Sequence, residues 1–101
     1  MIARIWHGTV KEADFDAYAE FLIEKAIPDY QQTEGFVKLT FLKSRRDGVG
    51  HFKLITYWES LEVIRNFAGD ELDRAKYYEE DQQYLLYFEE RVEHYEVFAE
   101  E

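Results

Sequence analysis

The stretch that decides the fold runs from residue 35 to residue 58 and reads GFVKLTFLKSRRDGVGHFKLITYW. Two runs rich in β-branched and aromatic residues flank the pair Asp47-Gly48, which favours a tight hairpin turn because glycine readily takes a positive φ. We therefore expect two antiparallel strands, Phe36–Ser44 and His51–Trp58, joined by this turn.

Upstream of the hairpin, the sequence predicts one strand and one helix. The compact apolar run Ile2–His7 is typical of a strand, and Thr9 followed by Glu12 fits a capping box at a helix start. Apolar residues then recur at helical spacing as far as Ala26, and Pro28 marks the expected end of the regular helix.

Downstream of the hairpin, we expect short helices and a last strand. Ser60 can cap a helix that Gly69 ends, Asp70 can begin a second helical segment that reaches Tyr78, and a third contains Tyr84–Phe88. Arg91–Phe98 is the expected last strand. The order βαββαβ predicts an α+β domain of the ferredoxin-like class, a four-stranded antiparallel sheet in the order 4-1-3-2 with helices on one face. No linker or repeat interrupts it, so we expect a single domain over residues 1–101.

The composition excludes several classes of partner and chemistry. The formal charge is −10, from 22 acidic and 12 basic residues, and such a surface repels nucleic acid and anionic membranes. The absence of cysteine removes disulfides, thiolate nucleophiles and cysteine-bound metals, which fits a cytoplasmic protein. We expect no signal peptide, and no apolar run reaches membrane-spanning length. Aromatic residues make up 18% of the chain, which suits either a dense core or a ring-lined pocket.

Both faces of the hairpin strands carry apolar side chains. Val37, Leu39 and Phe41 alternate with Phe36 and Leu42, whereas a sheet open to water on one side alternates apolar with polar residues. Because the helices can cover one face alone, we expect the same face of a second copy to cover the other, which makes a homodimer. The residues expected in that interface are Trp6, Phe41 and Trp58.

Five short stretches resemble the antibiotic biosynthesis monooxygenase-like family of the dimeric α+β barrel superfamily: IARIWHG (2–8), YWES (57–60), IRNFAGD (64–70), AKYY (75–78) and VEHYEV (92–97). The resemblance covers almost the whole chain. It implies two sheets packed face to face in a dimer, with a pocket between sheet and helices in each subunit. Relatives include cofactor-free oxygenases of polyketide quinols and haem-degrading enzymes, so the resemblance alone selects no reaction.

The haem-degrading relatives use an Asn, a Trp and a His at positions that match His7, Phe67 and Tyr77 here. All three residues differ, and the His that binds haem iron is absent. We therefore expect no cofactor and no haem turnover. The resemblance to the quinol-oxidising relatives implies instead that His7, Tyr77 and Tyr78 could activate a phenol.

The three histidines, His7, His51 and His94, are expected toward one end of the sheet, where one of them could act as a base. His7 is expected on the helix-covered face together with Ala3 and Ile5, which would place it in the pocket. We expect no metal site, because a three-histidine site needs all three side chains on one face.

Two function hypotheses follow. The first is a small cofactor-independent monooxygenase that acts on an aromatic or quinol-like metabolite, with His7 as the base and Tyr77 or Tyr78 as the hydrogen-bond donor. The second is a non-catalytic domain of the same fold that binds a small aromatic or apolar molecule. The residues expected to line the pocket are Phe67, Ile64, His51 and His94.

For two charged residues, Arg4 and Asp81, we expect a structural role. Arg4 is expected to pair with an acidic residue of the last strand, Glu93 or Glu96, because it lies on a mostly buried strand. Asp81 is expected to cap the last helical stretch.

Overall fold

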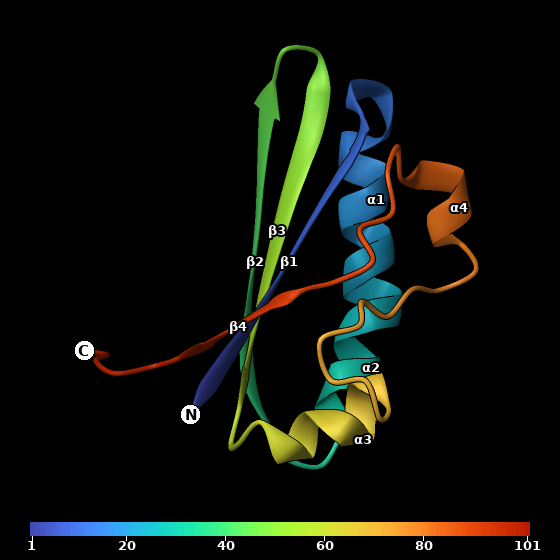
Figure 1. Cartoon of the computed structure of the whole chain (residues 1–101). Helices are drawn as coiled ribbons and strands as arrows, with labels where there is room; N and C mark the ends of the chain where they lie inside the picture. The colour runs from blue at the N-terminus through green and yellow to red at the C-terminus, as the bar shows by residue number, and fades with distance from the viewer.

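β1 (Ile2–Lys11) lies inside a four-stranded antiparallel sheet in the computed structural model, which describes all 101 residues (Figure 1). It pairs with β3 (Val49–Trp58) on one side and with β4 (Glu93–Glu96) on the other, while β2 (Phe36–Arg46) pairs with β3. The observed order β2-β3-β1-β4 confirms the order expected from the sequence.

The β2–β3 hairpin turns at Asp47-Gly48, as the sequence predicts. Both residues have positive φ, 54° and 75°, as a two-residue hairpin turn of this kind requires. The strands run closer to the turn than expected, because Arg46 and Val49 already pair across it. The turn chemistry therefore fixes the register of the whole hairpin.

One long helical stretch packs against one face of the sheet (Figure 1). It consists of a short turn (Glu12–Asp14), α1 (Phe15–Phe21), a wider π-helical turn (Leu22–Ala26) and α2 (Ile27–Gln31). The expected capping box does not form, because Thr9 belongs to β1. Pro28 does not end the regular helix either. It lies in the first turn of α2, directly after the wider turn, where its missing N–H does not stop the helix from continuing.

The region after β3 has less helix than the sequence predicts. A short turn (Glu62–Ile64) leads into α3 (Arg65–Ala68), which ends at Gly69 with a φ of 86°. Residues 69–80 contain no helix, contrary to the expectation, and α4 (Asp81–Tyr84) follows. Tertiary hydrogen bonds replace the helical ones there: the amides of Ala75 and Val92 donate to the carbonyls of Glu90 and Asp73. None of the helices is long and apolar enough to cross a lipid bilayer.

The two faces of the sheet differ sharply in burial. On β1 the even-numbered residues face the helices, while the odd-numbered ones, Ala3, Ile5 and His7 among them, belong to the face that no helix covers, which we call the free face. The core lies between the sheet and the long helical stretch. Its largest completely buried side chains include Trp58 and Tyr18.

The burial pattern corrects the expected dimer interface. Trp58 is fully buried and Trp6 is 9% exposed, both within the core of a single chain. Phe41 packs edge-on against Tyr30 of α2, with the ring centroids 6.1 Å apart. Side chains alternate between the faces of a strand, so these three point toward the helices and not toward the free face.

Candidate functional site

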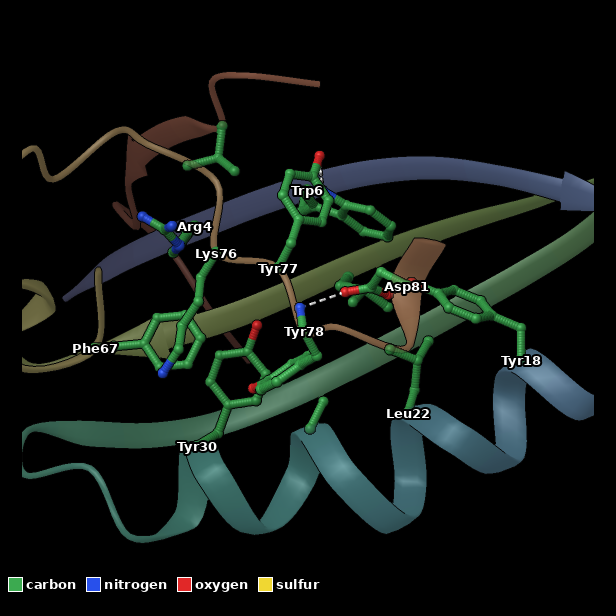
Figure 2. Close-up of a pocket in the computed structure, with 13 residues that line it drawn as sticks. Arg4, Trp6, Tyr18, Leu22, Tyr30, Phe67, Lys76, Tyr77, Tyr78 and Asp81 are labelled. Atoms are coloured by element: carbon green, nitrogen blue, oxygen red, sulfur yellow. Dashed lines mark hydrogen bonds between the residues drawn. The ribbon is translucent and has the colours of Figure 1, made fainter. Parts of the chain in front are cut away.

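A cavity lies between the covered face of the sheet and the long helical stretch, closed on its third side by residues 69–80 (Figure 2). The space open to the centre of a water-sized sphere is about 30 Å³, enough for one or two water molecules. An organic ligand therefore fits only when part of the wall moves. The lining residues are Arg4, Trp6, Tyr18, Leu22, Ala26, Tyr30, Leu54, Phe67, Lys76, Tyr77, Tyr78, Asp81 and Val92.

Arg4 brings a buried positive charge to this cavity. Its guanidinium donates to the carbonyl oxygens of Leu72 (2.6 Å) and Arg74 (2.7 Å) and lies 3.0 Å from Nε2 of His94. No carboxylate lies within ion-pair distance, so the expected pairing with Glu93 or Glu96 is wrong. Burial lowers the pKa of Arg4, yet a guanidinium remains charged in proteins.

Tyr77 and Tyr78 both line the cavity, and both hydroxyl groups already have partners. The Tyr77 hydroxyl donates to the Glu89 carbonyl oxygen (2.5 Å) and accepts from the Trp6 indole N–H (3.2 Å). The Tyr78 hydroxyl donates to Oδ2 of Asp29 (2.5 Å). Burial raises the pKa of both phenols, so both remain protonated near neutral pH. These residues fasten the 69–80 segment to its neighbours.

Asp81 is a buried carboxylate in the cavity wall. One carboxylate oxygen accepts from the Tyr18 hydroxyl (2.8 Å), and the other accepts from the backbone N–H of Tyr78 (2.7 Å). Asp81 is 3% exposed and is the first residue of α4, whose N-cap is Glu80, so the expectation that Asp81 caps this helix is wrong. Burial raises its pKa, which makes it a stronger base than an exposed carboxylate.

Tyr30 is a second cavity residue that the sequence reading missed. Its ring stacks on Phe67 with the centroids 4.5 Å apart, and the residue is 8% exposed. Its hydroxyl has no hydrogen-bond partner, and no polar side-chain atom of the chain is both unpartnered and fully enclosed. The hydroxyl therefore reaches the cavity, as Figure 2 shows. The signal was present: continuing the spacing of Tyr18, Leu22 and Ala26 past Pro28 leads to Tyr30.

The histidines do not gather in the cavity. His7 shares a face with Ala3 and Ile5, as expected, but that face is the free one, so its expected place in the pocket is wrong. Its ring nitrogens lie 3.4 Å from Nδ1 of His51 and 3.3 Å from Oε1 of Glu89. His51 is likewise outside the cavity.

His94 points to the covered face but lies behind Arg4 and does not line the cavity. Of the other residues expected in the pocket, Phe67 lies in the cavity wall, while Ile64 is completely buried in the core beside it. No group of three or more His, Asp or Glu side chains is arranged to hold a metal ion.

Comparison with known proteins gives a likeness among solved structures. The chain matches no protein-family model, and no curated protein gives a significant match. Among solved structures it resembles a Bacillus cereus protein provisionally named an antibiotic biosynthesis monooxygenase. The TM-score is 0.58 and the identity 23%, and the match covers 99% of this chain and 95% of the other. Over its whole length, therefore, the chain has the α+β fold of an antibiotic biosynthesis monooxygenase-like protein.

Proposed function

We propose that this protein is a small cofactor-independent monooxygenase, folded as one domain over residues 1–101, that acts on a planar phenolic or quinol-like molecule. The observation that carries the proposal is the buried carboxylate of Asp81 in the wall of a small aromatic cavity. The rings of Trp6, Tyr30, Phe67 and Tyr77 offer flat surfaces to a flat substrate.

The proposed chemistry uses the substrate as its own electron donor. Asp81 removes a proton from the CH₂ carbon of the substrate, the resulting anion passes electrons to O₂ in the cavity, and Asp81 returns the proton to the water that leaves. One oxygen atom enters the substrate as a carbonyl, and the other leaves as water with the two hydrogens that the carbon loses, so that CH₂ and O₂ become C=O and H₂O. Asp81 takes the role that the sequence reading gave to His7, because His7 lies outside the cavity.

Substrate entry requires the 69–80 segment to move. It has no helix of its own, and many of the contacts that hold it are polar, among them Arg4 to two of its carbonyls and Lys76 and Tyr78 to Asp29. We propose that this segment acts as the lid of the site.

The test is oxygen consumption by the purified protein over a panel of quinols and related phenols, with ¹⁸O₂ to follow the atom that enters the product. Asp81→Asn should lower kcat by roughly 10²-fold, the usual scale for loss of a general base. Activity of the parent should fall on acidification at a higher pH than for an exposed carboxylate, because the raised pKa of Asp81 protonates it earlier.

The matched control is Asp16→Asn, which changes a carboxylate whose side chain is 82% exposed, and it should leave kcat unchanged. Thermal melts on both variants separate loss of chemistry from loss of fold. Absence of oxygen uptake with every quinol would contradict the proposal, and so would full activity of a folded Asp81→Asn protein.

A second candidate is a non-catalytic domain that binds a small aromatic molecule. The aromatic rings of the cavity wall support it equally, because they can bind a flat molecule whether or not a reaction follows. Ligand-dependent stabilisation in thermal melts without oxygen consumption would select this candidate over the enzyme.

We also propose that two copies associate through their free faces. Ile5 pairs with Ile55 in the middle of this face, and Ala3 pairs with Tyr57 and Tyr95 beside them. Tyr95 is 50% exposed in the single chain. Apolar surface at the centre of a sheet face is stabilised when another copy removes it from water.

A further inference from the structure

We propose that the cavity takes its ligand as an anion, an aromatic hydroxyl compound whose phenolate oxygen is held between the Tyr30 hydroxyl and the Arg4 guanidinium. The proposal rests on the function proposed above, since it names the class of molecule that the same cavity takes. It concerns two residues, Tyr30, to which the sequence analysis gave no role, and Arg4, to which it gave only a structural one.

The first observation is the unbalanced charge of Arg4. The residue is 3% exposed, and its hydrogen bonds go to two neutral carbonyls and one imidazole, with no carboxylate in reach. A buried charge without a counter-ion is unfavourable, and a ligand that brings the opposite charge removes this penalty.

The guanidinium also has donors to spare. It carries five N–H bonds, of which three serve Leu72, Arg74 and His94. Two N–H groups are therefore left in a residue that lines the cavity. Hydrogen bonds from a charged donor to an anionic oxygen are among the strongest in proteins.

The second observation, independent of the first, is the unpartnered Tyr30 hydroxyl. The residue is 92% removed from water, and its hydroxyl has no partner in the chain but opens onto the cavity, so a ligand oxygen there can become its hydrogen-bond partner. Burial raises the pKa of Tyr30 well above its ordinary value, so the hydroxyl keeps its proton and acts as a donor.

The Arg4 guanidinium and the Tyr30 hydroxyl lie at the same end of the cavity. The Arg4 guanidinium carbon lies 5.7 Å from the centroid of the Phe67 ring, and Tyr30 stacks on that same ring. Figure 2 shows the Tyr30 hydroxyl directed into the cavity near Arg4 and Phe67, with Asp81 and Tyr18 at the other end. An anionic oxygen at the Arg4 end therefore avoids the Asp81 carboxylate.

The other charged groups near this end of the cavity neither neutralise Arg4 nor add a second unpaired positive charge. Lys76 lies over the Phe67 ring, 4.4 Å from its centroid, but its ammonium is already paired with Asp29 at 2.8 Å. Asp73 influences the pKa of Arg4 without forming an ion pair with it. The net positive field at this end comes from Arg4.

The experiment uses 4-nitrophenol as the probe, because its absorbance reports its own ionisation. Titrated from pH 5 to 9 with excess protein, the bound probe should have a pKa at least one unit below that of the free probe, which means that the phenolate binds at least tenfold more tightly than the phenol. The neutral analogue 4-nitroanisole should bind more weakly than the phenolate.

Tyr30→Phe should weaken phenolate binding about tenfold and leave 4-nitroanisole binding unchanged. The variant should fold, because the lost hydroxyl has no partner in the chain, and thermal melts check this. The matched control Tyr87→Phe changes a residue that is 66% exposed and should leave both affinities alone.

Three results would overturn the proposal: no binding of the probe, equal affinity for its two ionisation states, or equal phenolate binding by Tyr30→Phe and the parent. Its failure is distinguishable from failure of the oxygenase proposal. Oxygen uptake without phenolate preference would overturn the anion site alone, and phenolate preference without oxygen uptake would overturn the oxygenase alone.

Discussion

At the scale of single residues, Gly8 shows how closely the covered face is packed. The indole of Trp6 lies over this glycine, and a Cβ built on Gly8 would come within 2.1 Å of the ring. No real Cβ contact is that short, so the ring would have to move. Since Trp6 also donates to the Tyr77 hydroxyl, its displacement would disturb the cavity wall.

Gly8→Ala should therefore lower the free energy of unfolding by about 1–3 kcal/mol, the usual cost of overpacking a core. Urea unfolding monitored by circular dichroism gives the value. The neighbour Thr9 points to the free face, so Thr9→Ala is the control and should change stability by less than about 0.5 kcal/mol. Equal stability of Gly8→Ala and the parent would show that Trp6 is free to move.

The sequence pattern assigns β1 to the wrong face. Residues 2, 4 and 6 of this strand form one set and residues 3, 5 and 7 the other, and the small or apolar Ala3 and Ile5 favour placing the second set inside. The structure buries the first set because distant backbone carbonyls satisfy the guanidinium. Acceptors supplied by residues 72 and 74 leave no trace in the pattern of the strand itself.

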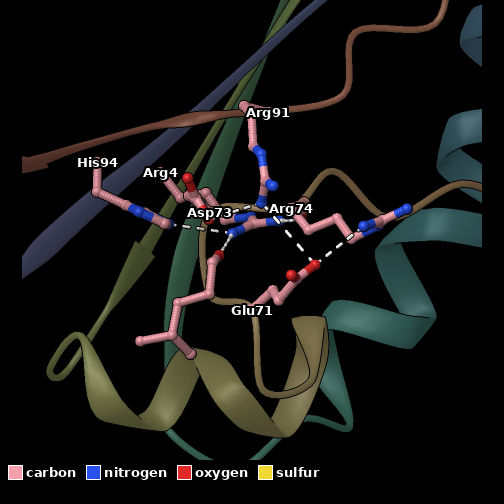
Figure 3. Close-up of polar contacts among 7 residues, drawn as sticks. Arg4, Glu71, Asp73, Arg74, Arg91 and His94 are labelled. Atoms are coloured by element: carbon pink, nitrogen blue, oxygen red, sulfur yellow. Dashed lines mark hydrogen bonds and ion pairs between the residues drawn. The ribbon is translucent and has the colours of Figure 1, made fainter.

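At the scale of elements, β4 depends on the contact between His94 and Arg4 (Figure 3). Arg4 can only donate, so Nε2 of His94 must accept, and the imidazole must be neutral. Burial and then the Arg4 charge lower the pKa of His94, while Asp73 acts against them. Figure 3 shows Glu71, Arg74 and Arg91 in the same polar cluster.

The pH dependence of stability follows from the direction of this shift. Below about pH 6.5 the unfolded chain protonates His94 while the folded chain does not, so the free energy of unfolding falls as the pH drops toward the lowered pKa. Between pH 7 and 5 the melting temperature of the parent should fall more steeply than that of His94→Gln. Parallel curves in thermal melts would refute this role of His94.

Secondary structure was predictable where local chemistry decides it, and not elsewhere. The hairpin follows from Asp47-Gly48, and the strand order follows from the βαββαβ pattern. The 69–80 segment carries helix-forming residues, yet the carbonyls of Leu72 and Arg74 turn toward Arg4 on the opposite side of the core. Tertiary contacts of that kind override propensity, and the cavity depends on them.

At the scale of the whole molecule, the proposed dimer can be tested on the correct face. A charged substitution at Trp6, Phe41 or Trp58 would disrupt the core of a single chain, because these side chains pack in it. Ile55 instead lies on the free face, where it pairs with Ile5 of the neighbouring strand. Ile55→Glu should convert a dimer of twice 12.2 kDa into a folded monomer, measured by sedimentation equilibrium.

Leu61→Glu provides the control, because Leu61 is a 44% exposed apolar residue outside the sheet. It should leave the mass unchanged. A parent protein that sediments as a monomer at micromolar concentration would rule out the dimer, and an Ile55→Glu protein that remains dimeric would place the interface elsewhere.

The pairing of the first and last strands ties the two ends of the chain together. Ile2 lies opposite Glu96 in the sheet, and the amide of Val97 donates to the carbonyl of Met1 at 3.0 Å. A short glycine-rich linker can therefore join the termini, and new ends can be opened at Asp47-Gly48, where nothing packs against the glycine. Such a circular permutant keeps both partners of β1, and it would show whether the order of the strands along the chain matters for folding or only their arrangement in the sheet.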